Sequence, residues 1–301
     1  MNIGIFGVGN FGATHIKVLK EIKEFNIIGF FDPNTKRAKV IEERFYVKLY
    51  TQPDNLIEKC DAIDVVSETK THFDIIQMAI KHNKHIFIEK PICIHKSELI
   101  NLMKLKSNYQ PIIQVGHIER YNPAIQEGFK DISNIETIKT KRTGPLNDRN
   151  SATSITLDFM IHDIDLVLSL IKEPIISIEA VGLKQKNGLY NYVKSLLLFE
   201  NGAKAELIAE RDNTINNERN MLITCRNKTI EIDLLKRMTK TIIKKEAKSW
   251  QSENNINPLK NQFVDFYHNI TKNLTPIVGL TESCKAVDTA LKIDAILNRK
   301  S

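Results

Sequence analysis

The chain has 301 residues, of which 42% are hydrophobic and 26% charged, a composition typical of a folded protein with one large or two ordinary domains. The formal charge of +7 is spread along the sequence without a basic stripe interleaved with aromatic residues, which argues against a nucleic-acid partner. Met1 leads directly into an apolar strand and no apolar run reaches membrane-spanning length, so we expect a cytoplasmic protein without a membrane partner. The four cysteines are scattered without metal-ligand spacing, so we expect buried thiols and no metal site.

A glycine-rich turn follows the first apolar strand, expected over residues 2–6. The turn reads Gly7-Val8-Gly9-Asn10-Phe11-Gly12, and an amphipathic helix is expected after it. In dinucleotide-binding folds the first glycine permits a tight turn, the second lets a pyrophosphate approach the backbone, and the third lets the helix pack on the strand. We therefore predict that residues 7–12 bind a dinucleotide. A plain strand–helix unit is the alternative.

A carboxylate follows the second strand, which is expected over residues 27–31. Asp32 stands twenty residues beyond Gly12. A carboxylate at this distance accepts hydrogen bonds from the adenosine ribose hydroxyls and repels a 2′-phosphate. The sequence therefore favours NAD over NADP as the cofactor, a preference that the nearby Lys36 and Arg37 weaken.

Strands and helices alternate through the rest of the first part of the chain. Strands are expected at 62–66, 85–88 and 112–115, and helices at 34–45, 53–59, 71–82 and 96–106. Such alternation indicates a doubly wound parallel sheet. We expect a Rossmann domain over residues 1–118.

Glu89-Lys90-Pro91 ends the strand expected at 85–88, which we take as the fifth of the sheet. The carboxyl ends of parallel strands face the ligand in open α/β sheets, so Lys90 can reach the nicotinamide end of a dinucleotide. Pro91 fixes the turn and ends the strand. Glu89 either contacts the cofactor or supports the loop. An ordinary charged strand exit is the alternative.

The second part of the chain, 119–301, has β character. Strands are expected at 135–143, 175–184, 192–199, 203–210, 219–225 and 229–234. Helices are expected at 157–171, 258–273 and 281–298. This pattern predicts an α+β domain with a large, open, mostly antiparallel sheet. One face of such a sheet could meet a second subunit, so we expect a homo-oligomer.

Asp158 and His162 have the spacing i,i+4 within the helix expected at 157–171. On one helix face, the carboxylate can hold one imidazole nitrogen and leave the other to exchange a proton with substrate. A surface ion pair is the alternative. A metal site formed with Asp163 and Asp165 is not favoured, because adjacent residues point in different directions around a helix.

Together, these motifs resemble the Gfo/Idh/MocA oxidoreductases, in the family's order and over essentially the whole chain. The resemblance implies a Rossmann domain, a second domain with an open sheet, and hydride transfer between a nicotinamide and a sugar or polyol. By the same resemblance Lys90 is the lysine of the family's Glu-Lys-Pro motif. His162 is its usual acid/base histidine, with Asp158 as the group that orients it.

Further segments resemble one branch of this family. Residues 116–124 are similar to a stretch of bacterial UDP-sugar 3-dehydrogenases, and residues 142–145 and 157–165 to segments of UDP-N-acetylglucosamine 3-dehydrogenases. Cations near a diphosphate suit such a substrate, although each arginine could instead form an ion pair between domains. The expected substrate-binding residues are Lys90, His117, Arg120, Asn122, Arg142, Arg149 and His162.

The resemblance implies an NAD-dependent oxidation of the C3 hydroxyl of a UDP-N-acetylhexosamine to a 3-keto sugar nucleotide. Lys90 or His162 would accept the hydroxyl proton; the sequence leaves open which. The resemblance also implies a downstream aminotransferase as a pathway partner, as in lipid A biosynthesis. The alternatives are a dehydrogenase of the same fold for inositol, a free sugar or a bilin, and a non-catalytic NAD-binding regulator.

Overall fold

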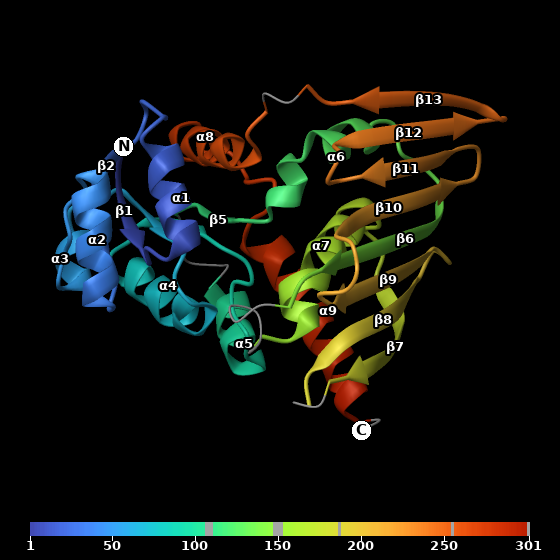
Figure 1. Ribbon diagram of the computed structural model, residues 1–301, viewed down its shortest axis with the longest axis horizontal. Coiled ribbons are helices and arrows are strands. Elements are labelled where there is room, and N and C mark those ends of the chain that lie inside the picture. Colours follow the sequence, from blue (N-terminus) through green and yellow to red (C-terminus); the bar gives the residue numbers. More distant parts are fainter. Residues whose placement is uncertain (106–110, 147–152, 186–187, 254–255, 300–301) are drawn as a thin grey trace. The chain divides into compact units, whose positions relative to one another are not determined.

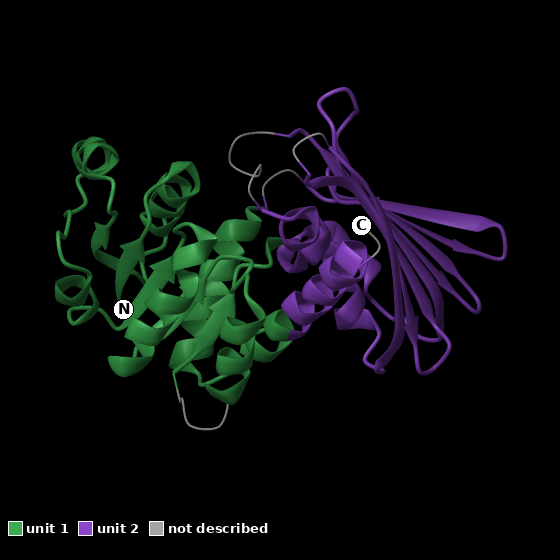
Figure 2. Cartoon of the chain, turned by 90° about the horizontal axis from the view of Figure 1, so that it is seen from below, with its two compact units in different colours: residues 1–118, 257–284 green, residues 119–256, 285–301 purple. Residues whose placement is uncertain are grey.

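The computed structural model describes residues 1–105, 111–146, 153–185, 188–253 and 256–299. Two compact units emerge from the contacts between Cα atoms (Figure 2). The first unit comprises residues 1–118 and 257–284, and the second comprises residues 119–256 and 285–301.

Segment 257–284 therefore clusters with the N-terminal part of the chain, whereas the sequence analysis assigned all of 119–301 to one domain. The reason is the apolar face of helix α8 (Pro258–Thr271). Phe263 on this face is fully buried in the same hydrophobic cluster as Leu19. A helix whose apolar face packs on a core belongs to that core, however far apart the segments lie in sequence.

A five-stranded parallel sheet forms the first unit, as the alternation of elements predicts (Figure 1). Its strands are β1 (Asn2–Phe6), β2 (Asn26–Phe31), β3 (Ala62–Val65), β4 (His85–Ile88) and β5 (Ile113–Val115), in the order β2-β1-β3-β4-β5. Leu49 adds an isolated parallel bridge to Phe30, where no strand was expected. With this bridge counted as a strand, the order becomes the 3-2-1-4-5-6 of dinucleotide-binding folds, and β4 is the fifth strand.

Helices connect these strands. They are α1 (Asn10–Leu19), α2 (Thr35–Phe45), α3 (Pro53–Ile57), α4 (His72–Lys81) and α5 (Lys96–Lys104), with the short 3₁₀ turn η1 (Thr69–Thr71) before α4. A further 3₁₀ turn, η3 (Ile118–Tyr121), follows β5 and leads into the second unit. The order of the sheet reverses between β1 and β3. Ligands bind beyond the carboxyl ends of the strands at such a reversal, and the turn that follows β1 lies there.

An eight-stranded sheet forms the second unit, antiparallel except for the parallel pair β6 and β9. Its strands are β6 (Ile135–Gly144), β7 (Ile175–Lys184), β8 (Tyr190–Phe199), β9 (Lys204–Arg211), β10 (Glu218–Cys225), β11 (Thr229–Asp233), β12 (Met238–Ile243) and β13 (Glu246–Gln251). Their order in the sheet is β13-β12-β11-β10-β6-β9-β8-β7. The fold class is therefore a Rossmann sheet followed by an α+β unit with a large, mostly antiparallel sheet, as expected.

The sequence analysis missed the hairpin of β12 and β13. Nearly all of β13 is exposed, so it lacks the alternation of apolar and polar residues that marks a half-buried strand. Its turn is formed by Lys244 and Lys245, whose φ angles are 47° and 76°. Turns of this kind usually carry Asn or Gly, so the residues at the turn gave no signal either.

The helices of the second unit lie on one face of its sheet, and the other face carries no helix among the described residues (Figure 2). These helices are α6 (Pro123–Gly128), the π-helical turn η4 (Thr156–Met160), α7 (Ile161–Leu170) and the greater part of α9 (Leu280–Arg299). Short α6 was not expected. The single helix expected over 157–171 is in fact a π-helical turn followed by an α-helix.

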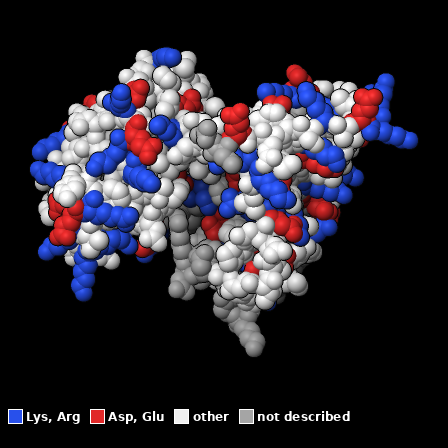
Figure 3. Space-filling model, turned by 45° about the horizontal axis from the view of Figure 1, so that its top comes forward, with Lys and Arg blue, Asp and Glu red and all other residues white. Residues whose placement is uncertain are grey.

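Charges of both signs mingle on the face of the molecule seen in Figure 3, where Lys and Arg lie among Asp and Glu. All four cysteines are free and buried, as expected. Among the helices of the described residues, none combines the length and the apolar character needed to cross a membrane.

Candidate functional site

The turn after β1 has the shape that a dinucleotide requires. Gly7 has a φ of 97°, and a Cβ atom there would strike the backbone of Ser67. A Cβ atom on Gly12 would strike the carbonyl oxygen of Gly7. Gly9 differs, because a Cβ atom there would meet no atom within 4 Å, and Gly9 is the N-cap of α1 without any side-chain cap. Open space before the uncapped N–H groups of a helix fits a pyrophosphate.

Asp32, at the end of β2, holds this turn to the neighbouring strand. Its Oδ2 accepts the backbone N–H of Val8 at 2.8 Å, and its Oδ1 accepts that of Asn34 at 2.8 Å. Arg37 also donates to both oxygens, from Nε at 3.2 Å and from Nη2 at 2.9 Å. Burial alone would raise the pKa of Asp32, but the hydrogen bonds from Arg37 and Val8 outweigh it and lower the pKa.

All the usual acceptor positions of the Asp32 carboxylate are therefore used. Ribose hydroxyls can bind this carboxylate only by sharing or replacing the contacts of Arg37, because the two backbone donors are part of the turn. The side chain of Arg37 is 43% exposed and can move, whereas the side chain of Asp32 is almost fully buried. Arg37 is thus the adjustable partner of a fixed carboxylate.

Glu89 and Lys90 follow β4 directly. Glu89 is buried and Lys90 is half-buried. Burial raises the pKa of Glu89 to about 7, although the charges of His15 and Lys90 act in the opposite direction. His72, the first residue of α4, contacts the turn at Lys90 and Pro91, with Nδ1 2.9 Å from the carbonyl oxygen of Pro91. Burial lowers the pKa of His72 to about 4, although the carbonyl oxygens of Pro91 and Ser67 act in the opposite direction.

His15 and Asp64 are two buried residues that the sequence analysis did not single out. Both are completely inaccessible, and His15 Nδ1 lies 2.9 Å from Asp64 Oδ2. Each has a sequence signal in retrospect. His15 interrupts the apolar face of the first helix, and Asp64 interrupts the buried strand β3. An unpaired charge is rarely buried, so an acid within such a strand indicates a partner.

In the second unit, Asp158 lies in the π-helical turn and His162 at the start of α7. The i,i+4 argument assumed one regular α-helix, whereas this pair spans a π-helical turn and the start of an α-helix. Oδ2 of Asp158 accepts a hydrogen bond from Nη2 of Arg211 at 3.0 Å. The role of Asp158 in orienting His162 stays a prediction. Single π-helical turns are often found at functional sites.

Arg211, the last residue of β9, was missed because a lone arginine at the end of a strand carries no pattern. Only 2% of Arg211 is exposed. Its guanidinium lies over the ring of Phe159, 5.1 Å from the centroid, and donates from Nη1 to the carbonyl oxygen of Thr153 at 2.8 Å. These contacts fasten the π-helical turn to the sheet.

Glu119 is the centre of a buried charged network in the second unit. Its Oε1 lies 3.1 Å from Nη1 of Arg142 and 3.2 Å from Nη1 of Arg219. Arg142 also donates from Nε and Nη2 to the two carboxylate oxygens of Asp163, at 3.0 and 2.9 Å. Burial would raise the pKa of Glu119, but the positive charges of Arg142 and Arg219 outweigh it and lower the pKa.

Several residues expected to bind substrate therefore have structural partners. Arg142 is 3% exposed and held by Glu119 and Asp163. Arg120 donates from Nε to Oδ2 of Asp165 at 2.6 Å. The side chain of Asn122 caps α6 and donates to Glu119. Arg120 and Arg142 thus take part in ion pairs within the second unit, and their role in binding substrate stays a prediction.

The remaining expected residues are placed as follows. His117 is 1% exposed, and its Nε2 lies 3.5 Å from the hydroxyl oxygen of Ser283. Arg149 lies outside the described residues. Asn10 is exposed at the start of α1, and the ring of Phe11 packs edge-on against His15, with centroids 4.6 Å apart.

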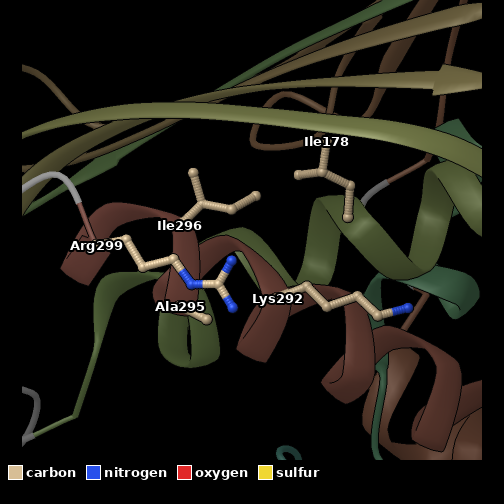
Figure 4. A pocket seen from close by; sticks show the side chains of 5 residues that line it. All are labelled: Ile178, Lys292, Ala295, Ile296 and Arg299. Atoms are coloured by element: carbon tan, nitrogen blue, oxygen red, sulfur yellow. The ribbon is translucent and has the colours of Figure 1, made fainter.

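A hollow of about 270 Å³ in the second unit is not part of this site. Ile178 of β7 points from the strand toward α9, which supplies the other lining residues (Figure 4). These residues are Lys292, Ala295, Ile296 and Arg299. The lining contains no residue from the sequence motifs.

Known proteins share these features. Residues 1–117 match the model of an oxidoreductase family with an NAD-binding Rossmann fold, and residues 134–231 match that of the GFO/IDH/MocA C-terminal domain. UDP-N-acetylglucosamine 3-dehydrogenase of Acidithiobacillus ferrooxidans is 29% identical over 215 residues, which cover 70% of this chain and 67% of that protein. Myo-inositol 2-dehydrogenase of Thermotoga maritima is 27% identical over 194 residues, or 60% of this chain and 58% of that protein.

Among solved structures, UDP-N-acetylglucosamine 3-dehydrogenase from Acidithiobacillus ferrooxidans superimposes with a TM-score of 0.93 and 24% identity, covering 99% of this chain and 98% of that one. This likeness concerns the fold. The two family models account for the glycine turn and Glu89-Lys90-Pro91 in the first unit and for most of the sheet in the second. The chain belongs to the Gfo/Idh/MocA family of oxidoreductases.

Proposed function

We propose that this oxidoreductase uses NAD to oxidise the C3 hydroxyl of a UDP-N-acetylhexosamine, such as UDP-N-acetylglucosamine, to a 3-keto sugar nucleotide. The similarity to the Acidithiobacillus enzyme is the observation that carries the choice of substrate. The open turn at Gly9 and the buried Asp32 support the choice of cofactor. An aminotransferase is the proposed consumer of the product, since a ketone at C3 is the group that such enzymes convert to an amine.

Lys90 and His162 are the residues that we propose for proton transfer. An ammonium or imidazolium group can hydrogen-bond the reacting oxygen, and the neutral form of either side chain can accept its proton while the hydride passes to the nicotinamide. When bound, NAD supplies the hydride acceptor. Arg211 keeps Asp158, the proposed orienting carboxylate, attached to β9.

Inositol oxidation is the second candidate, because an inositol dehydrogenase from Thermotoga maritima is nearly as similar to this chain as the sugar-nucleotide enzyme is. The two substrates differ in chemistry. Only the sugar nucleotide carries a uridine and a diphosphate, whose charges require cationic or backbone N–H partners.

We further propose a cytoplasmic location, since four free, buried thiols suit a reducing compartment.

UDP-N-acetylglucosamine with NAD should raise the thermal unfolding midpoint, because a ligand that binds only the folded state stabilises it. At a ligand concentration of about 100 times the dissociation constant, the free energy of unfolding rises by about 2.7 kcal/mol. Differential scanning fluorimetry measures the midpoint. Mass spectrometry identifies the 3-amino sugar nucleotide that an aminotransferase, with an amino donor, forms from the 3-keto product. myo-Inositol with NAD is the matched comparison. Stabilisation and NADH formation with inositol alone would replace the proposed substrate by the second candidate.

Lys90→Ala and His162→Ala should each lower kcat by about 10²- to 10⁴-fold, the usual contribution of a general acid or base. Binding of NADH, followed by its fluorescence, should stay near that of the unmodified chain, because neither change touches the glycine turn. Lys81→Ala is the control, since Lys81 is an exposed lysine on α4. If either variant keeps full activity, that residue has no part in proton transfer.

Asp32→Ala should weaken NAD binding by about 10- to 100-fold, because hydrogen bonds to a charged group contribute about 1.5–3 kcal/mol. It should also improve NADP binding, since the variant lacks the carboxylate that repels a 2′-phosphate and leaves Arg37 free to pair with it. Titrating both reduced cofactors by fluorescence measures the two effects. The double variant Asp32→Ala, Arg37→Ala separates them, because the gain for NADP should disappear while the loss for NAD remains.

The open face of the eight-stranded sheet is the surface that we propose for a second copy of the chain. Leu196, Leu198 and Ile208 are partly exposed, alternating with buried residues that face the helices. Val181 and Leu183, on the edge strand, are more than half exposed. The charges among them are paired, as Lys194 is with Glu206 at 2.8 Å. A face of apolar and neutralised groups suits burial against its own copy.

Light scattering at micromolar concentration should therefore give at least twice the mass of one chain. Leu196→Asp should reduce the mass to that of a monomer, because it places a charge in the apolar part of this face. Leu235→Asp is the control, since Leu235 is an exposed leucine that follows β11 in a turn. A monomeric mass for the unmodified chain would contradict the proposed assembly.

A further inference from the structure

Three titratable side chains lie next to one another in the core of the first unit. His15 comes from α1, Asp64 from β3, and Glu89 from the residue after β4. His15 and Asp64 are 0% exposed and Glu89 is 9% exposed. The imidazole lies between the two carboxylates, with Nδ1 at 2.9 and 3.1 Å from the two oxygens of Asp64 and Nε2 at 3.6 Å from Oε1 of Glu89.

Apolar rings and closely packed backbone surround these three side chains. Rings of Phe11, Phe87 and Phe263 pack around the imidazole, with centroids 4.6, 6.1 and 5.3 Å from its own. On the other side, Gly116 brings its backbone so close to Glu89 that a Cβ atom would overlap Oε1. Nε2 of His15 and Oε1 of Glu89 are both buried without a hydrogen-bond partner, and they face each other. Two such atoms are costly unless a proton lies between them.

A count of protons shows what this pair can hold. Asp64 accepts the Nδ1–H of His15, which leaves Nε2 to face Glu89. The proton between them is carried either by Nε2, next to a carboxylate, or by Oε1, next to a neutral imidazole. In both states the three groups together carry one negative charge. Loss of that proton would set two lone pairs against each other in a dry, apolar site and add a second negative charge.

The shifts in pKa agree with this geometry. Burial would lower the pKa of His15, yet the charges of Asp64 and Glu89 outweigh it and raise the pKa. Burial raises the pKa of Glu89 to about 7, against the charges of His15 and Lys90. The charged groups that act on Glu89 are therefore His15, Asp64 and Lys90. Helix α8 packs against the imidazole of His15 through the uncharged ring of Phe263.

We propose that His15 is a positioning residue for the Glu89-Lys90-Pro91 motif: its imidazole, oriented by Asp64, shares one proton with Glu89 and so fixes the carboxylate beside Lys90. Glu89 also accepts a hydrogen bond from the backbone N–H of Lys90, so a fixed carboxylate fixes the backbone from which the Lys90 side chain extends. His15 lies on the helix that begins at the glycine turn. It therefore ties the proposed cofactor turn to the proposed catalytic lysine, and in this respect the inference rests on the proposed function.

Nuclear magnetic resonance of the ligand-free chain, labelled with ¹⁵N-histidine, tests the shared proton without any substrate. The His15 signals are those that disappear in His15→Gln. In the unmodified chain at about pH 7 the Nε2 signal should show a partly protonated nitrogen. In Glu89→Gln, whose amide is neutral and has no proton to exchange, the same nitrogen should lose its partial protonation and accept the amide N–H. An Nε2 signal that Glu89→Gln leaves unchanged would overturn the shared proton.

Thermal unfolding gives a second measurement. Because the folded chain holds the proton more tightly than the unfolded chain does, its stabilisation is present below about pH 6.5 and is lost as the pH rises through about 7. Glu89→Gln has no such proton to lose. The unfolding midpoint of Glu89→Gln relative to the unmodified chain should therefore rise between about pH 6 and about pH 9. A constant difference over this range would contradict the inference.

Kinetics test the effect on Lys90. His15→Gln should lower kcat by about 10- to 100-fold, as expected for a small displacement of a catalytic group, and leave NADH binding close to normal. For the unmodified chain we expect a step near pH 7 in the kcat profile, where Glu89 beside Lys90 loses its proton. In His15→Gln this step should move to higher pH, because burial then acts on Glu89 without the opposing imidazolium. In Glu89→Gln the step should be absent. A merely structural histidine would change the unfolding midpoint but neither the pH profile nor kcat.

His82→Gln is the matched control, because His82 also faces an aspartate, with Nε2 3.5 Å from Oδ1 of Asp54, but at the surface. It should leave kcat and its pH profile unchanged.

The outcomes of these experiments distinguish the positioning role of His15 from the proposed function. A shared proton without turnover of any sugar nucleotide would refute the proposed function and leave the proton in place. Normal turnover in His15→Gln, with an unchanged pH profile, would refute the positioning role and leave the function in place.

Discussion

The close approach of helix α1 to the strands β1 and β3 is the constraint on which the first unit depends. Gly7 and Gly12 make it possible, because any side chain at either position would strike backbone atoms. Two consequences follow from the same contact. The backbone before the helix is left open at Gly9, where a pyrophosphate fits, and His15 is pressed into the core against Asp64. The cofactor turn and the buried histidine are thus products of one packing contact.

Charged groups buried in pairs have a comparable role in the second unit. Arg142 joins β6 to α7 through Asp163 and to the segment before α6 through Glu119. Arg211 fastens the π-helical turn that carries Asp158. Breaking such a pair leaves an uncompensated buried charge, which is strongly destabilising. These ion pairs therefore hold the segments next to His162 in one arrangement, and the two arginines serve the scaffold of the site.

The strands and helices followed well from the sequence wherever burial was regular. Strands β8 to β11 alternate between buried and more exposed residues over most of their length, and the sequence analysis expected a strand at each of them. The hairpin of β12 and β13 escaped because β13 is exposed on nearly all its residues and its turn is made of two lysines. The bridge at Leu49 consists of a single residue pair, too short to leave any pattern. The π-helical turn at 156–160 was missed because a five-residue change of helical pitch leaves the apolar pattern almost intact.

The sequence by itself determined the features whose parts are contiguous. The glycine turn, Asp32 and Glu89-Lys90-Pro91 each depend on local backbone geometry at the end of one strand, so a few adjacent residues suffice to predict them. Only the tertiary structure decided which groups those motifs meet. His15 meets Asp64 across 49 residues, and Asp158 meets Arg211 across 53. Such partners are chosen by the burial of charge in a folded core, where every polar atom needs a counterpart, and no local pattern of residues records that choice.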